Sequence, residues 1–178
     1  EKPPSPSSFP LQLLPVAGSD AWRSSTPSSP PRVPLSEPLS ADNLFMEGVR
    51  GAAAYAQGER VTMEDEHAMV ADFQKFRKDY SPEMQQQAFF GVYDGHGGSV
   101  APAHCRDHMH VNVARNILPG VNLCNAITQG SRDTEEHFKA IAAEKGDSSG
   151  AVTVCALLSG TELCVANIGD ARVVLCRK

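Results

Sequence analysis

Residues 89–100 read FFGVYDGHGGSV, an apolar run that leads into a carboxylate, a histidine and three glycines. The run 88–93 combines aromatic and β-branched residues, so we predict that it forms a short buried strand. Asp94 would stand at the end of this strand, where a carboxylate can bind a hard cation such as Mg²⁺ or Mn²⁺.

The two residues after Asp94 extend this interpretation. Because Gly95 has no Cβ, its backbone carbonyl can approach the same ion. His96 would lie beside the ion, where an imidazole is suited to general acid catalysis near neutral pH. The stretch therefore predicts a metal site with a proton donor. The simpler alternative is a turn between a strand and a helix, with a surface histidine.

A second polar segment, GERVTMEDEH, covers residues 58–67. Residues 61–69 alternate with a period of two, so we predict a strand that could lie beside 88–93. Glu64 and Asp65 would point to opposite faces of it. Arg60 could bind a phosphate with both arms of its guanidinium, and the acids could hold metal-bound water. Taken alone, these residues favour a surface ion pair on an amphipathic strand.

The first part of the chain has a different composition. Ten of the 13 prolines and ten serines lie in the first 40 residues. Such a segment cannot bury enough apolar surface to offset its conformational entropy, so we expect residues 1–42 to form a disordered leader. Its Ser-Pro and P-x-x-P spacings could mark phosphorylation sites or an SH3 ligand. Composition alone also produces them, so a linker is favoured. Residues 43–178 then make up one domain of ordinary size.

Charge and cysteine content exclude several classes of protein. The chain of 178 residues has a net charge of −5 and no run of Lys or Arg, which argues against a binder of nucleic acid or of anionic membranes. It has no apolar stretch of about 18 residues that could span a membrane. Its five cysteines are odd in number and lack C-x-x-C spacing. We therefore expect free thiols in a reducing compartment, cytoplasmic or nuclear, although an upstream targeting segment could be missing.

Two helices and three further strands are predicted after the DGHGG motif. Residues 99–117 indicate a helix with Ser99 at its N-cap. A capping-box pattern of Asp133 and Glu136 indicates the start of a second helix. Gly146 would end that helix. The β-rich runs are 150–158, 161–169 and 171–178. Their short connections predict antiparallel neighbours, and hence an α+β fold.

Three segments together resemble the metal-dependent serine/threonine phosphatases of type 2C, the PPM family. They are GERVTMEDEH, FFGVYDGHGG and VANIGDARVVLCRK, which follow one another in this order. The resemblance covers about residues 48–178. It implies a sandwich of two antiparallel β-sheets flanked by helices (α-β-β-α), with two Mg²⁺ or Mn²⁺ ions between the sheets.

The resemblance also implies roles for the metal-site residues. Asp94 would bridge the two ions, and the Gly95 carbonyl would bind one of them. Glu64 and Asp65 would act through metal-bound water. Asp170, in the G-D-A-R turn, would lie at a third, weaker metal site.

Two further residues would carry the reaction on phosphoprotein substrates. Arg60 would hold the phosphate, and His96 would protonate the leaving serine or threonine oxygen. Attack by a metal-activated hydroxide would release phosphate without a covalent enzyme intermediate. The resemblance further implies a protein that is monomeric at full length.

The sequence departs from the family pattern in three places. Gly169-Asp170-Ala171-Arg172 has alanine where the family usually has serine, and Ser149-Gly150 is followed by apolar residues. The chain also stops at Lys178, about halfway through the family's domain and before two further metal-ligand aspartates. We therefore expect the chain alone to be incomplete and inactive. The alternative function is a catalytically inactive, phosphatase-like binding module or a truncated gene product.

Two other sites are less favoured. His104 and His108 have the i, i+4 spacing that a zinc site can use, but the sequence shows no third ligand nearby. A cysteine hydrolase built on Cys105 lacks an identifiable partner to orient it.

Overall fold

A computed structural model describes residues 40–46 and 48–176. The predicted leader, residues 1–42, lies outside the described residues except for its last three positions. Those three positions begin the first strand, β1 (Ser40–Met46), ahead of the predicted boundary at residue 43.

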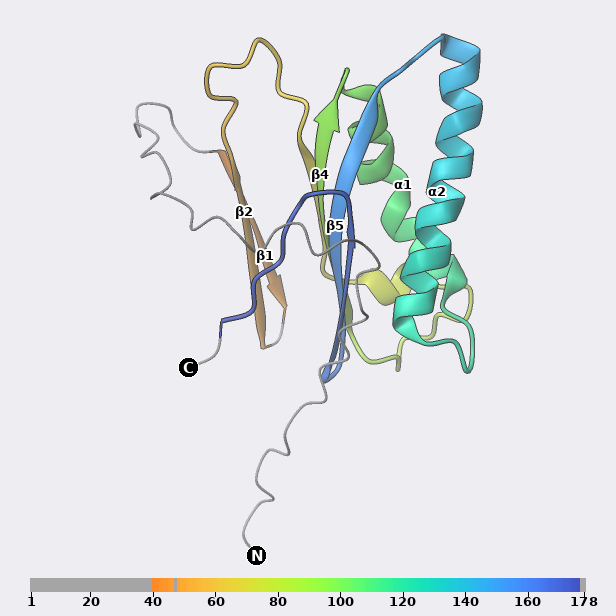
Figure 1. The fold of residues 1–178 in the computed structure, drawn as a ribbon. Helices are drawn as coiled ribbons and strands as arrows, with labels where there is room; N and C mark the ends of the chain where they lie inside the picture. Colours follow the sequence, from red (N-terminus) through yellow and green to blue (C-terminus); the bar gives the residue numbers. More distant parts are fainter. Residues whose placement is uncertain (1–39, 47, 177–178) are drawn as a thin grey trace, which may run out of the picture.

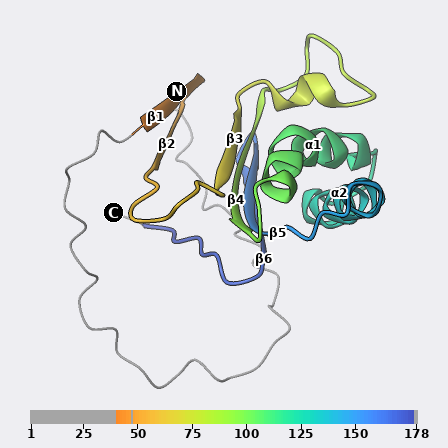
Figure 2. The ribbon, with the colours of Figure 1, turned by 90° about the horizontal axis from the view of Figure 1, so that it is seen from above.

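Two antiparallel sheets and a pair of helices form three successive layers (Figure 2). The first sheet pairs β1 with β2 (Val49–Tyr55). The second sheet has the order β3-β4-β5-β6, with bounds Glu66–Val70, Gln87–His96, Gly150–Ser159 and Glu162–Ile168. Helices α1 (Val100–Asn116) and α2 (Leu123–Lys145) cover the face of this sheet that lies away from β1 and β2 (Figure 1). This arrangement confirms the predicted α+β class.

The core lies between the four-stranded sheet and the helices. Phe89 of β4 stacks on Phe73 of a short 3-10 helix (Phe73–Phe76), with their ring centroids 5.7 Å apart. Ile127 of α2 and Leu157 of β5 are fully buried in the same cluster. Burial of such side chains is worth roughly 1.5–3 kcal/mol each, so this layer supplies most of the apolar stabilisation.

The two helices approach each other closely at a glycine. A Cβ on Gly130 of α2 would lie 2.6 Å from the Cα of Val113 of α1. Gly146 ends α2 in the left-handed conformation, with φ 64°, as the sequence predicts. The predicted start of α2 at Asp133 is wrong. The helix begins ten residues earlier, where the Asn122 side chain accepts a hydrogen bond of 2.7 Å from the Cys124 amide.

The strands after the helices are partly as predicted. The runs 150–158 and 161–169 correspond to β5 and β6, which pair in the expected antiparallel register. The predicted strand 171–178 is not found: residues 171–176 are irregular, and 177–178 lie outside the described residues. Val174 and Leu175 are more than half exposed there. A β-rich composition produces a strand only where a neighbour offers pairing, and this segment has left the edge of β6.

Two cysteines that were expected to be free are joined. Cys124 of α2 and Cys164 of β6 form a disulfide, with their Cα atoms 5.8 Å apart. It ties the helix layer to the sheet, and it removes the argument for a reducing compartment that rested on free thiols. Within the described residues, no helix has the length and apolar character needed to cross a membrane.

Candidate active site

The two faces of β4 contact different layers. Phe89 and Tyr93 belong to the buried cluster beneath the helices. Phe90 packs instead on β2, where a Cβ on Gly51 would lie 2.7 Å from the Phe90 ring. Side chains alternate along a strand, so Asp94 projects from the same face as Phe90. Asp94 is exposed and lies inside β4, which is longer than the predicted strand 88–93.

The pairing of β3 with β4 brings a second carboxylate to Asp94. Glu66 lies opposite Tyr93 in this antiparallel ladder. Continuing the register by one residue sets Asp65 opposite Asp94, and side chains directly opposite each other share a face. The pairing therefore brings Asp65 and Asp94 to the same end of the sheet.

Neighbouring contacts confirm which face is which. Glu66 points to the helix side, where its Oε1 lies 2.9 Å from Nη1 of Arg106 in α1. His67 points to the opposite side, where its Nε2 lies 2.9 Å from Oδ2 of Asp42 in β1. Asp65, one residue before Glu66, therefore belongs to the side of His67. The predicted strand 61–69 begins only at Glu66, so Glu64 and Asp65 precede it.

Glu64 lies against Gly95 through its backbone. A Cβ on Gly95 would overlap the Glu64 carbonyl oxygen and would stand 2.8 Å from Cγ of Pro102. Only glycine leaves room for this approach. The Thr62 hydroxyl donates a hydrogen bond of 3.2 Å to Oε1 of Glu64. The absence of a side chain at residue 95 thus lets the segment before β3 come down onto the end of β4.

His96 is the last residue of β4 and is exposed. Its ring lies over the neighbouring strand, because a Cβ on Gly150 would stand 2.8 Å from Cε1 of His96. The chain turns only after the histidine, at Gly97 and Gly98, whose φ values are 71° and 136°. The predicted strand 88–93 ended three residues too early, since the motif is strand as far as His96.

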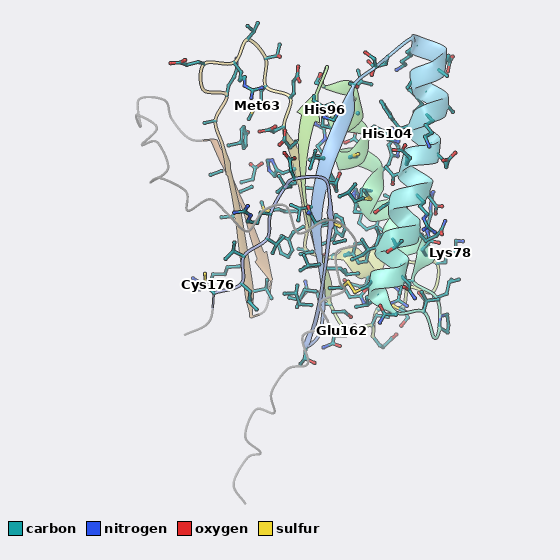
Figure 3. The ribbon with its side chains drawn as sticks, in the orientation of Figure 1. Met63, Lys78, His96, His104, Glu162 and Cys176 are labelled. Carbon is teal, nitrogen blue, oxygen red and sulfur yellow. A yellow bond between two sulfur atoms is a disulfide. The ribbon has the colours of Figure 1, made fainter. Side chains whose placement is uncertain are left out.

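Arg60 lies in the loop between β2 and β3 and is exposed. The Gln57 side chain donates hydrogen bonds to the carbonyl oxygens of Arg60 and Val61, at 2.7 and 3.2 Å. Met63 marks the same loop in Figure 3, which shows it at the same end of the sheets as His96. The loop therefore brings a free cationic side chain to this end of the molecule.

Asp170 follows β6 at the level of the other acids. Ile168 pairs with Thr153, and Val152 pairs with Asp94. A Cβ on Gly169 would lie 2.6 Å from Cγ1 of Val152. The chain at Gly169 is thus level with Asp94 along the sheet, and the exposed Asp170 is the next residue.

A cleft of about 650 Å³ lies between β2 and this face of the four-stranded sheet. Asp65 lines it, as do Arg172, Val173 and Val174 of the last described segment. The acids at this end of the sheet and the backbone carbonyl of Gly95 offer only oxygen atoms as possible ligands. Oxygen ligands are those that Mg²⁺ and Mn²⁺ prefer, so the residues present fit a hard divalent cation.

The structure also bears on the two less favoured sites, the cysteine hydrolase at Cys105 and the zinc site at His104 and His108. Burial raises the pKa of the Cys105 thiol to about 11, so it would be a poor nucleophile near neutral pH. His104 and His108 are joined by a third histidine, His137 of α2. The sequence did not reveal this third residue because its proximity depends on how the two helices pack.

Comparison with known proteins identifies a matching family and several relatives of this chain. A family model described as "Protein phosphatase 2C" matches residues 50–178. The mouse protein phosphatase 1E is 34% identical over 119 residues, which are 67% of this chain and 16% of that protein. The human protein phosphatase 1A is 33% identical over 140 residues, covering 73% of this chain and 35% of that protein.

A rice protein, probable protein phosphatase 2C 67, is 33% identical over 143 residues, or 78% of this chain and 38% of its own length. The chain therefore spans less than two fifths of the length of each of these curated relatives. A solved structure of a C. elegans sex determining protein aligns over 68% of this chain and 26% of its own, with a TM-score of 0.49 and 18% identity.

Proposed function

Because this chain belongs to the protein phosphatase 2C family, we propose that residues 43–178 form the N-terminal part of a metal-dependent protein serine/threonine phosphatase domain. The observation that carries the proposal is that the pairing of β3 with β4 brings Asp65 and Asp94 to the same end of the sheet, where Asp65 lines the cleft. Two exposed carboxylates at the same end of a sheet can both offer oxygen ligands to a divalent cation, which favours a metal site over a packing role.

Five residues would hold the divalent ions. Asp94 and the Gly95 carbonyl would bind directly, Glu64 and Asp65 would bind through water, and Asp170 would serve a weaker third site. We propose Mg²⁺ or Mn²⁺, because every donor is an oxygen. Such ions, when bound, lower the pKa of water and neutralise phosphate charge.

The remaining roles fall to two exposed side chains. Arg60 would bind the substrate phosphate, since its guanidinium can offer two parallel N–H donors to phosphate oxygens. The ordered turn at Gln57 would hold the Arg60 backbone while its side chain extends. His96 would donate a proton to the serine or threonine oxygen as the P–O bond breaks, because an alkoxide is a poor leaving group without one. The substrates would accordingly be phosphoproteins.

The experiment is hydrolysis of a phosphothreonine peptide by the full-length protein that contains this chain. We expect phosphate release in the presence of Mn²⁺ and none after treatment with a chelator. Peptide that is bound but not hydrolysed with Mn²⁺ present would overturn the enzymatic proposal. It would favour the alternative, a phosphatase-like module that binds partners.

The role of His96 can be separated from that of the metal site. The variant His96→Gln should lose most of its activity on the phosphothreonine peptide, whose leaving oxygen needs a proton. It should keep most of its activity on p-nitrophenyl phosphate, whose leaving phenolate is stable without one. Equal losses on the two substrates would show that His96 has another role.

A further inference from the structure

Three histidines meet between the two helices, on the opposite side of the sheet from the cleft. His104 and His108 belong to α1, and His137 belongs to α2. Each offers a ring nitrogen, and these three atoms all lie within 4.8 Å of one another. Figure 3 labels His104 in the region between α1 and α2. The spacing of His104 and His108 is visible in the sequence, but the approach of His137 depends on how the two helices pack. The cluster of three is therefore a product of the fold.

His104 is the buried member and is incompletely satisfied. It is 8% exposed, and its Nε2 has no hydrogen-bond partner within the described chain. A buried polar atom without a partner costs roughly 1–3 kcal/mol, so such atoms normally have a ligand, an ion or a water. The neighbouring rings do not supply a partner: their centroids lie 4.3 Å (His108) and 4.9 Å (His137) from that of His104.

The state of His104 suits a metal ligand. Burial, together with the neighbouring His108 and His137, lowers its pKa to about 4. The imidazole is therefore neutral at pH 7 and keeps a lone pair for coordination.

We propose that His104, His108 and His137 bind a transition-metal ion, most favourably Zn²⁺, which ties α1 to α2. Imidazole nitrogens suit Zn²⁺, and three histidines with one water complete a tetrahedral site. Zn–N bonds of about 2.0–2.1 Å would bring the nitrogens to about 3.4 Å from one another. This needs a movement of about 1 Å. His108 is half-buried and His137 is exposed, so both rings have room to make it.

This site is separate from the proposed phosphatase site in place and in chemistry. The helices cover the face of the four-stranded sheet that lies away from β2 (Figure 2), whereas the cleft lies against β2. The acids of the cleft offer only oxygen donors, which favour Mg²⁺, and the cluster offers only nitrogen donors, which do not. Excess Mg²⁺ can therefore fill the cleft without competing for the histidines.

The test is titration of the full-length protein with Zn²⁺ in excess Mg²⁺, with binding measured by calorimetry. In a second titration Co²⁺ replaces Zn²⁺, because its absorption spectrum reports the coordination geometry. Every protein carries Cys176→Ser, because that exposed free thiol would also bind Zn²⁺. The variants are His108→Gln and His137→Gln, which avoid the buried His104. His110→Gln is the matched control: it lies on the same helix, but its ring packs on Phe76, with centroids 4.9 Å apart.

We expect one Zn²⁺ to bind, with the visible absorption bands of tetrahedral Co²⁺ in the substituted protein. His108→Gln and His137→Gln should each lose more than about tenfold in affinity, and His110→Gln should be unchanged. Circular dichroism checks that each variant is folded. No binding, or binding that survives His137→Gln, would overturn the proposal and leave the cluster as ring packing alone. Equal loss in His110→Gln would overturn it as well.

Discussion

The backbone of Glu64 lies against Gly95 so closely that residue 95 has no room for a side chain. This contact joins the loop that carries Arg60 to the strand that carries Asp94. It also lies just beyond the β3–β4 ladder, which ends with Glu66 opposite Tyr93. The glycine of the D-G-H motif is thus required by packing, in addition to any role of its carbonyl in binding metal.

Replacing Gly95 by alanine tests this contact. The new Cβ would overlap backbone atoms of Glu64, so the segment before β3 would have to move. We expect a loss of about 1–3 kcal/mol in the free energy of unfolding, together with a fall in phosphatase activity. Urea denaturation and phosphopeptide hydrolysis measure the two effects. Gly58→Asn is a suitable control, since Gly58 has φ 62° with open space around it, and asparagine tolerates that conformation.

For a second glycine, Gly130, we expect replacement by alanine to lower stability, although helix propensity alone predicts that it would raise it. Alanine favours a helix interior over glycine by about 1 kcal/mol, so Gly130→Ala would stabilise an isolated α2. In the folded chain its Cβ would stand 2.6 Å from both the Cα and the amide nitrogen of Val113. We expect net destabilisation in urea, because the two helices would have to separate. A more stable variant would contradict the close approach of α1 and α2.

The fold could be predicted from local signals where those signals decide the structure. The end of α2 at Gly146 and the paired runs of β5 and β6 follow from glycine and from period-two patterns. The start of α2 could not be predicted from Asp133, because that side chain serves a tertiary contact. Its Oδ2 accepts a hydrogen bond of 2.7 Å from Nδ2 of Asn116 in α1. The true cap, Asn122, lies eleven residues before Asp133.

The residues of the candidate site could likewise be predicted only in part. The sequence indicated Asp94 and His96 from their place after an apolar strand, and both lie at the end of β4. It could not indicate that Asp65 would lie at the same end of the sheet as Asp94, because that depends on the register between two strands about 30 residues apart. The third histidine of the helix cluster, His137, was missed for the same reason, since helix packing alone brings it to His104.

Thiol labelling tests the arrangement of the five cysteines. In the native chain we expect fast reaction at pH 8 only at Cys176, which is exposed. Burial raises the pKa of Cys105 to about 11 and that of Cys155 to about 12, so both should react slowly. Denaturation without reductant should expose three thiols in all, since Cys124 and Cys164 are bonded. Five reactive thiols under those conditions would contradict the disulfide.

Stability should depend on pH through buried His104. Its pKa in the folded chain is about 4, against an ordinary value of 6.5. Between these values the unfolded chain binds more protons, so stability is full above about pH 6.5 and falls as the pH drops toward 4. The slope is at most about 1.4 kcal/mol per pH unit for one group. Urea unfolding at several pH values, with chelator present, measures it.

The control for this dependence is His104→Gln, which removes the titrating group while keeping a polar side chain. We expect its stability to vary less between pH 7 and pH 5 than that of the wild type. His110, whose pKa burial also lowers, should leave a residual slope in both proteins. An unchanged slope in the variant would show that His104 is not the group responsible.

The most direct test of the central claim is the effect of Asp94→Asn on Mn²⁺-dependent hydrolysis of a phosphothreonine peptide by the full-length protein. The substitution keeps the size of the side chain and removes its charge, so we expect a fall in kcat of at least about 100-fold with the fold intact. Asp79→Asn, at an exposed carboxylate paired with Arg77, is the matched control and should keep its activity. Equal activity of Asp94→Asn and the wild type would contradict the assignment of the metal site to this end of the sheet.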